Sequence, residues 1–126
     1  MEHPRKTPIL VVEDEKDIRT ILEFVLSREG YEVVIAENGK MAKSFVDDNE
    51  PVDLVLLDIM LPYFDGFEIV TQIRSKEAWK SVPIIMLTSR SNEKDIVKAL
   101  ELGANDYVTK PFNVKELMAR VKRNLK

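Results

Sequence analysis

Short apolar runs alternate with amphipathic segments along this chain, and this alternation constrains the fold more than any other feature. Residues 54–57 are apolar at four consecutive positions, which is typical of a strand covered on both faces in a parallel sheet. Residues 9–12 and 84–87 have the same character, and two further strands are predicted at 31–36 and 106–109. The sequence therefore predicts five short strands, each followed by a helix.

Apolar residues recur at helical spacing in each segment that follows a strand. The first helix has them at i, i+3, i+4 and i+7, and Asp14 or Asp17 is expected to cap its start. Gly30 and Gly103 are expected to end the first and fourth helices. The apolar faces consist of Ile18, Ile21, Leu22 and Val25; Met41, Phe45 and Val46; Phe67, Val70 and Ile73; Ile96, Val97 and Leu100; and Val114, Leu117, Met118 and Val121.

Strict alternation of strand and helix predicts parallel strands with right-handed crossovers and helices on both faces of the sheet. We predict an α/β fold with a doubly wound five-stranded parallel sheet, (βα)5 and flavodoxin-like, in the strand order 2-1-3-4-5. A chain of 126 residues is expected to form one domain, residues 1–126, with residues 1–7 as a disordered leader.

Composition excludes several classes of function. The net charge of −3 argues against nucleic acid as a partner, and no apolar run approaches the roughly 20 residues of a membrane span. The chain has no cysteine, and its one histidine, His3, lies in the leader, so a thiolate metal site and a His-based triad are not expected. With no signal peptide, the cytoplasm is the expected location.

Polar side chains follow four of the five predicted strands. Glu13 and Asp14 follow the first strand, Asp58 the third, Thr88 the fourth and Lys110 the fifth. The carboxyl ends of parallel strands share one edge, and the predicted strand order reverses direction between strands one and three. Glu13, Asp14 and Asp58 are therefore expected to lie together.

Three carboxylates at one place repel each other unless a cation joins them. Oxygen ligands without His or Cys suit Mg²⁺. Lys110 and Thr88 add a charge and a hydroxyl that could bind a phosphoryl group, and an Asp such as Asp58 can form an aspartyl phosphate. Each of these residues alone has a plainer explanation as a helix start, a turn or a loop, but their combination at one edge favours a site.

Four segments give the chain its resemblance to a known family: residues 9–15, 57–66, 85–89 and 103–112, which read ILVVEDE, LDIMLPYFDG, IMLTS and GANDYVTKPF. They resemble the receiver domain of two-component response regulators, and the resemblance runs from about Thr7 to Leu125. It implies a phosphorylatable domain that accepts its phosphoryl group from a sensor histidine kinase or a histidine phosphotransfer protein.

The resemblance also implies roles for the residues of the site. Asp58 would be the phosphoacceptor, Asp14 a direct Mg²⁺ ligand and Glu13 a ligand through water. The backbone carbonyl of Met60 would be a further ligand, and Lys110 would bind the phosphoryl oxygens. Such a domain hydrolyses its own aspartyl phosphate slowly and has no independent small-molecule substrate.

For the switch, the resemblance implies that Thr88 moves on phosphorylation and that Tyr107 swings inward with it. The Lys110–Pro111 bond is expected to be cis. The output face would be the fourth helix, fifth strand and fifth helix, which could control an output domain or a partner protein. That face could also form a homodimer, because Lys98, Glu101, Asp106 and Arg120 resemble charges that pair in dimerising receivers. An ordinary solvated face explains these charges equally well, and Ile96 stands where such dimers often have a basic residue.

Two other departures concern the loops. Tyr63 stands where a small residue is usual, and we interpret Tyr63 and Phe64 as local packing in preference to a kinase-docking site. Met60 and Arg90 have long side chains at loop positions that border the phosphoryl group, which predicts slow loss of phosphate.

The residues present argue against three competing functions. A haloacid dehalogenase-type hydrolase needs a second Asp two residues after its nucleophile, where this chain has Met60. A flavodoxin-like cofactor binder needs a phosphate-binding loop after the first strand, where residues 13–15 would repel phosphate, and no glycine-rich phosphate motif exists. A receiver used only for docking would lack Asp58, Asp14 or Lys110, all of which are present.

Overall fold

A computed structural model describes residues 6–125, and its strands form one parallel sheet in the order β2-β1-β3-β4-β5. The predicted fold and strand order are therefore confirmed. The first five residues of the predicted leader, including His3, lie outside the described part. The strands are β1 (Pro8–Val12), β2 (Glu32–Ala36), β3 (Leu54–Leu57), β4 (Ile84–Thr88) and β5 (Asp106–Thr109).

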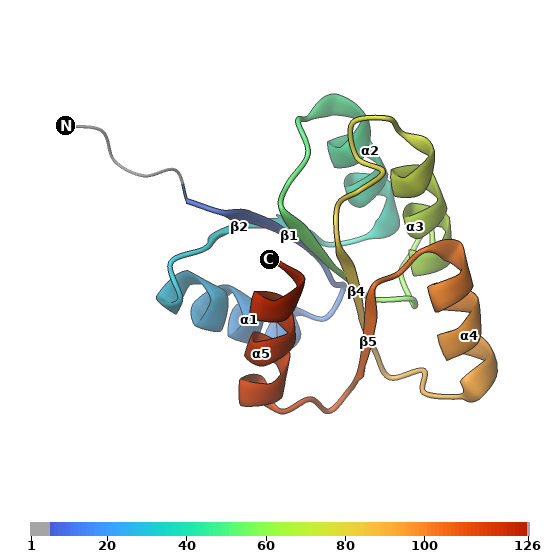
Figure 1. The fold of residues 1–126 in the computed structure, drawn as a ribbon. Coiled ribbons are helices and arrows are strands. Elements are labelled where there is room, and N and C mark those ends of the chain that lie inside the picture. Colours follow the sequence, from blue (N-terminus) through green and yellow to red (C-terminus); the bar gives the residue numbers. More distant parts are fainter. Residues whose placement is uncertain (1–5, 126) are drawn as a thin grey trace.

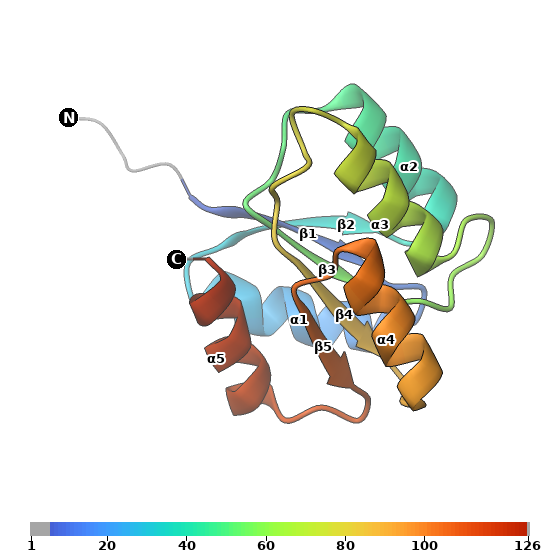
Figure 2. The ribbon, with the colours of Figure 1, turned by 45° about the vertical axis from the view of Figure 1, so that its right-hand side comes forward.

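Helices cover both faces of the sheet, as Figures 1 and 2 show. One face is covered by α1 (Lys16–Arg28) and α5 (Val114–Asn124). The other face is covered by α2 (Gly39–Asp48), α3 (Gly66–Ser75) and α4 (Glu93–Leu102). Within residues 6–125, no helix is long and apolar enough to cross a membrane.

Alternating strand residues divide the interior into two apolar layers, because successive side chains of a strand point to opposite faces. Leu54 and Leu56 of β3 pack in the layer under α1 and α5, while Val55 and Leu57 pack in the layer under α2, α3 and α4. All four side chains are at most 1% exposed. Burial on both faces explains why these positions are apolar without alternation, and it fixes the end of β3 rigidly in the centre of the sheet.

Helix ends follow from local side-chain chemistry. Asp65 and Glu68 form a capping box at the start of α3, and Asn92 accepts a hydrogen bond from the Asp95 backbone N–H at the start of α4. Gly103 ends α4 in the left-handed conformation, as expected. The expected cap of α1 was wrong: neither Asp14 nor Asp17 occupies that position, which falls on Glu15, whose side chain makes no capping bond.

Candidate functional site

Two buried carboxylates meet at the carboxyl edge of the sheet. Glu13 directly follows β1 and Asp58 directly follows β3, and these strands are paired so that Val12 lies opposite Leu57. The Asp58 backbone N–H donates a hydrogen bond to the Val12 carbonyl (3.1 Å), which extends the pairing by one residue. Glu13 is 1% exposed and Asp58 is 4% exposed, whereas Asp14 is exposed. The strand order thus brings the predicted acids to one place.

Lys110 joins these acids from the end of β5. Its Nζ lies 2.7 Å from Glu13 Oε1 and 3.0 Å from Asp58 Oδ2, and Glu15 Oε1 lies 3.6 Å away. The peptide bond between Lys110 and Pro111 is cis, as the resemblance implied. The predicted grouping of Lys110 with Glu13 and Asp58 is therefore present.

Burial and neighbouring charges shift the pKa values of Glu13 and Lys110. Desolvation raises the pKa of Glu13, and the neighbouring negative charge of Asp58 raises it further, against the hydrogen bond from Lys110. Burial of the ammonium opposes its charge, but hydrogen bonds to Glu13 and Asp58 outweigh burial and raise the pKa of Lys110. Lys110 is therefore a fixed positive charge beside the Asp58 carboxylate.

Glu13, Asp14 and Asp58 could together hold a metal ion. Each offers one carboxylate oxygen, and these oxygens all lie within 4.8 Å of one another. These three acids carry more negative charge than the single ammonium of Lys110 can balance, and a divalent cation would balance the excess. An all-oxygen donor set suits a hard ion, so these residues fit the expected Mg²⁺.

Arg19 holds the backbone that carries the first two acids. Its Nη1 donates hydrogen bonds to the carbonyl oxygens of Glu13 (3.1 Å) and Asp14 (2.8 Å). Its Nη2 lies 3.7 Å from Glu37 Oε1, at the end of the neighbouring β2. Residues 13–15 are therefore braced by α1 as well as by the sheet.

The loop after Asp58 folds back against the start of α3. Asp58 Oδ1 accepts a hydrogen bond from the Met60 backbone N–H (3.1 Å), and the Gly66 backbone N–H donates to the Ile59 carbonyl (2.8 Å). A Cβ at Gly66 would lie 2.3 Å from the Asp58 carbonyl oxygen, so only glycine fits this approach. The Asp58 backbone is thus closely confined.

The two aromatics of that loop differ in their surroundings. Phe64 is half-buried against the core layer under α2 and α3, which supports its interpretation as packing. Tyr63 is 73% exposed, has a positive φ of 74°, and lies with its ring 5.8 Å from Lys40 Nζ. Tyr63 is therefore a surface residue near the site, and its role as packing is not supported.

The predicted switch residues both contact Arg90 in the loop after β4. Thr88 is fully buried, and its Oγ1 accepts a hydrogen bond from the Arg90 backbone N–H (3.3 Å). The Tyr107 hydroxyl donates a hydrogen bond to the Arg90 carbonyl. The Arg90 guanidinium donates from Nε to Asp95 Oδ2 (2.7 Å) in α4, so it is held by α4. The Arg90 side chain is therefore engaged by α4, and the expected shielding of a phosphoryl group by Met60 and Arg90 stays a prediction.

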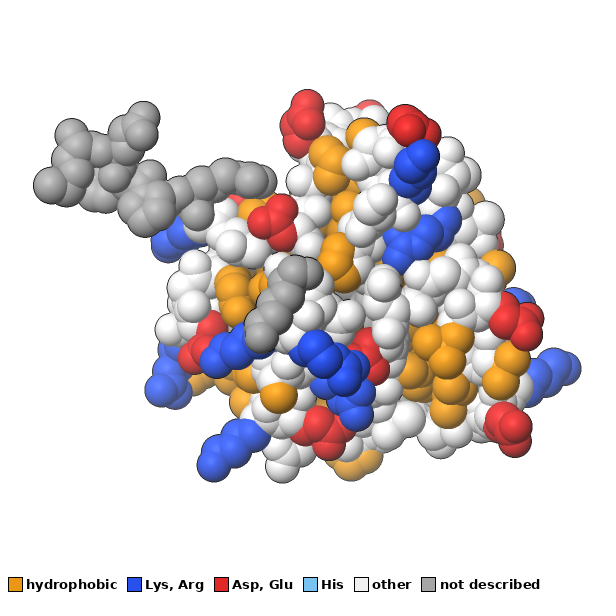
Figure 3. Space-filling model, in the orientation of Figure 1, with side chains coloured by type: hydrophobic (Ala, Val, Ile, Leu, Met, Phe, Trp, Pro, Cys, Tyr) orange, Lys and Arg blue, Asp and Glu red, His pale blue; other side chains and the backbone are white. Residues whose placement is uncertain are grey.

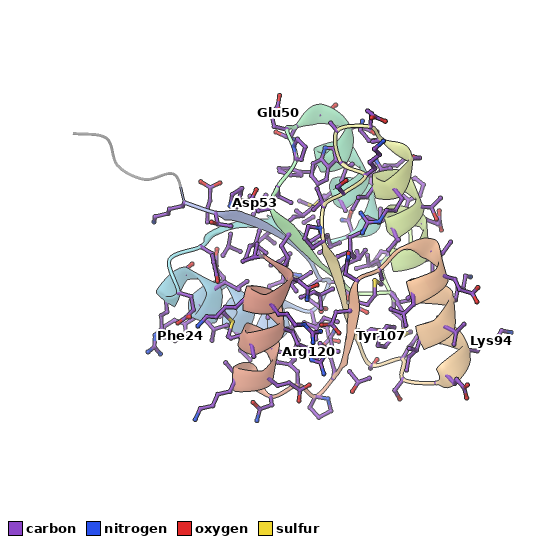
Figure 4. The ribbon with its side chains drawn as sticks, viewed as in Figure 1. Phe24, Glu50, Asp53, Lys94, Tyr107 and Arg120 are labelled. Carbon is purple, nitrogen blue, oxygen red and sulfur yellow. The ribbon has the colours of Figure 1, made fainter. Side chains whose placement is uncertain are left out.

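Asp106 forms ion pairs with two basic residues of α5 in the same chain. Its carboxylate accepts hydrogen bonds from Arg120 Nη1 (2.8 Å) and Arg123 Nη2 (2.7 Å), and it is 8% exposed. Figure 4 shows Arg120 between α5 and β5, with Tyr107 between β5 and α4. In Figure 3, Lys and Arg side chains gather over α5, beside an apolar patch over α4 and β5. The Asp106–Arg120 pair is intramolecular in this structure.

Comparison with known sequences decides the family. A sequence model of the response regulator receiver domain matches residues 9–122. The chain belongs to the response regulator receiver domain family. Such domains act in two-component systems, where they are signalling domains that work with histidine kinases and are not small-molecule enzymes.

Solved receiver domains share the whole fold. A putative response regulator from Chloroflexus aurantiacus is 36% identical, with 96% of this chain and 98% of that chain covered and a TM-score of 0.89. The chemotaxis response regulator CheY4 of Vibrio cholerae is 29% identical, with 95% and 99% covered and a TM-score of 0.88. The receiver domain of a sensor histidine kinase from Pseudomonas aeruginosa is 34% identical, with 96% and 98% covered and a TM-score of 0.87, and it has a magnesium ion coordinated in its active-site cleft.

In this receiver domain the structure brings Glu13, Asp58 and Lys110 into direct contact, with Asp14 beside them. Thr88 and Tyr107 form a second group, linked through Arg90. Arg19 and Asp95 are supporting residues that were not among the predicted residues of the site. Their only signals were an Arg on the helix after the acids and an Asp in the first turn of the fourth helix, both of which are common in solvent-exposed helices.

Proposed function

We propose that this receiver domain accepts a phosphoryl group on Asp58 from a histidine kinase or a phosphotransfer protein and then switches the surface formed by α4, β5 and α5. The observation that carries the proposal is the position of Lys110 Nζ, 3.0 Å from Asp58 Oδ2 and 2.7 Å from Glu13 Oε1. A buried Asp that shares one lysine with a second acid of a potential metal site is equipped to accept a dianionic group.

In the transfer step, an Asp58 carboxylate oxygen attacks phosphorus and forms an O–P bond. The P–N bond to the donor histidine breaks, and the imidazole nitrogen keeps its electron pair. Mg²⁺ held by Glu13, Asp14 and Asp58, with the Met60 carbonyl as a further ligand, would supply positive charge to the phosphoryl oxygens. Lys110 supplies a second positive charge at the same place, and Thr88 has a hydroxyl proton to donate.

Hydrolysis removes the phosphoryl group again: water attacks phosphorus, and the Asp58 carboxylate is the leaving group. We expect this self-hydrolysis to be slow, because Met60 carries a long side chain two residues from the acceptor. The rate of phosphate release from purified phosphoprotein measures it, and a half-life of seconds would contradict the expectation.

For the phosphodonor, α1 offers an apolar surface next to the site. Ile21 is 44% exposed and Phe24 is 61% exposed, and Figure 4 shows Phe24 on the outer side of α1. A groove of about 550 Å³ between α1 and α5 is lined in part by Val25, Val114 and Met118. A helical phosphodonor with apolar side chains fits this surface, because exposed apolar patches beside a site favour protein partners.

The output of the domain is a change in which conformation of the α4–β5–α5 surface is most populated. Val97 and Leu100 are exposed on α4, so this surface could bind a partner protein or a second copy of the chain. Because Arg120 and Arg123 already bind Asp106 within the chain, a homodimer would have to exchange these pairs or rely on the apolar residues.

Phosphorylation with acetyl phosphate and Mg²⁺ tests the chemistry directly. We expect intact mass spectrometry to show a gain of one phosphoryl group that hydroxylamine removes, as it removes acyl phosphates. Asp58→Asn should abolish the gain. Asp53→Asn is the matched control, because Asp53 is an exposed carboxylate just before the opposite end of the same strand. Equal phosphorylation of Asp58→Asn and the wild type would refute the proposal.

A further inference from the structure

Both predicted switch residues form hydrogen bonds with Arg90. Its backbone N–H donates to Thr88 Oγ1 (3.3 Å), and its carbonyl accepts from the Tyr107 hydroxyl. Any displacement of the Arg90 backbone therefore changes the surroundings of Thr88 and Tyr107 together. What holds Arg90 in place also holds both switch residues.

The side chain of Arg90 is held by a buried carboxylate. Arg90 Nε lies 2.7 Å from Asp95 Oδ2, and the Asp95 side chain is 8% exposed, so the carboxylate is largely removed from water. The Arg90 side chain is 42% exposed, so one partner of the pair is buried and the other faces solvent. A charge-assisted hydrogen bond of this length is among the stronger kinds.

Asp95 is itself fixed to the start of α4. Its backbone N–H donates to Asn92 Oδ1 (2.9 Å), and its Oδ2 accepts from Asn92 Nδ2 (2.8 Å). Because Asn92 caps α4, the carboxylate stays with the helix and cannot follow Arg90 if the loop of residues 89–91 moves. The ion pair ties that loop to the first turn of α4.

The arrangement seen here is suited to receive a phosphoryl group. Thr88 Oγ1 uses an acceptor position for the Arg90 N–H, which leaves its proton for a phosphoryl oxygen. Tyr107 is half-buried, with its hydroxyl bound to the loop, so its ring lies inward. Neither contact has to break for Thr88 to donate its proton.

We infer that the Arg90–Asp95 ion pair holds residues 89–91 with Tyr107 inward, in the arrangement that binds a phosphoryl group at Asp58. Arg90 and Asp95 are thus positioning residues that lower the free energy needed to reach the phosphorylated state. The inference rests on the proposed function of Asp58, and it assigns the regulation of that site to a contact outside it.

Beryllium fluoride, a phosphoryl mimic, tests this in the full chain in the presence of Mg²⁺. Asp95→Asn and Arg90→Met should each weaken its binding by about threefold to tenfold, which corresponds to the loss of one partly exposed ion pair. The double variant should bind no more weakly than the weaker single variant, because both changes remove the same contact. In protein labelled with 3-fluorotyrosine, the Tyr107 resonance, assigned with Tyr107→Phe, should move toward the solvent-exposed position in both variants.

Glu93→Gln is the matched control: it removes a carboxylate from the same turn of α4 and should leave binding and the Tyr107 resonance unchanged. Arg90→Met keeps the bonds between Asp95 and Asn92, so it serves as the test if Asp95→Asn does not fold. Failure of the wild type to bind beryllium fluoride would refute the proposed function. Normal or tighter binding by both single variants, beside a wild type that binds, would overturn this inference alone.

Discussion

Arg19 Nη1 lies 2.8 Å from the carbonyl oxygen of Asp14, and the same nitrogen donates to the carbonyl oxygen of Glu13. This contact orients the backbone of two potential metal ligands without touching their carboxylates. Such supporting contacts commonly change metal affinity by about 10-fold to 100-fold when they are removed.

We therefore expect Arg19→Met to weaken Mn²⁺ or Mg²⁺ binding by about tenfold or more, measured by calorimetry on the unphosphorylated protein. Arg19→Lys should lose less, because an ammonium can still reach one carbonyl. Arg28→Met, an exposed position on the same helix, is the control. Unchanged metal affinity in Arg19→Met would show that the sheet alone holds residues 13–15.

Lys110 balances acids that would otherwise repel each other. Replacing it with Met leaves Glu13 and Asp58 buried without their counter-charge, a change that costs about 3 kcal/mol or more. We expect this loss in the free energy of unfolding when the metal is chelated, and a partial recovery when Mg²⁺ is added, because binding stabilises the folded state.

Urea denaturation with and without EDTA checks this expectation, with Trp79 as a buried fluorescent reporter. Lys115→Met, which removes an exposed lysine from α5, should give the wild-type response to Mg²⁺. If Lys110→Met were no more sensitive to Mg²⁺ than the wild type, the acids would not form a shared cation site.

Arg74 joins α3 to two loops on the opposite side of the molecule from α1. Its guanidinium donates to the carbonyl oxygens of Gly103 (2.7 Å from Nη2) and Val82 (2.7 Å from Nη1), and to Asn105 Oδ1 (2.9 Å). We expect Arg74→Met to lower the free energy of unfolding by about 2 to 4 kcal/mol, because several partly buried acceptors lose their donor.

Arg74→Lys should keep only part of that stability, since an ammonium cannot reproduce the planar set of donors. Phosphorylation by acetyl phosphate should persist in both variants, because Arg74 does not contact the site. Denaturation and phosphorylation measured on the same samples separate the two effects, and loss of phosphorylation in a fully folded variant would contradict the assignment.

Asp95 should make stability depend on pH in acid. The hydrogen bond from Arg90 holds the pKa of the Asp95 carboxyl below its usual value of 3.8. The folded state thus binds the proton less readily than the unfolded state. The stability contributed by ionised Asp95 is therefore present above pH 3.8 and is lost as the pH falls through the lower, folded-state pKa.

The free energy of unfolding of the wild type relative to Asp95→Asn should thus shrink below pH 3.8. Arg90→Met removes the main cause of the shift, so the wild type should lose stability relative to it over the same range. A difference between wild type and Asp95→Asn that stays constant as the pH falls would mean that the ion pair does not stabilise the fold.

The sequence by itself determined the order of elements and the sheet, and it predicted the main residues of the candidate site. Apolar runs such as Leu54–Leu57 are typical of strands buried on both faces, and their alternation with helices predicts parallel pairing. Asp58 and Lys110 are 52 residues apart, yet both end a parallel strand, so topology alone places them at the same edge.

Only the tertiary structure decided which side chains support the site. Arg19 reaching the carbonyls beside Asp14, Arg90 reaching Asp95 and Arg74 reaching Gly103 depend on side-chain directions and distances between elements, which no periodic pattern encodes. The same holds for Gly66, whose need for glycine arises from the approach of the Asp58 carbonyl. Periodic burial specifies where an element lies, whereas a hydrogen bond to one carbonyl is fixed only once the elements have packed.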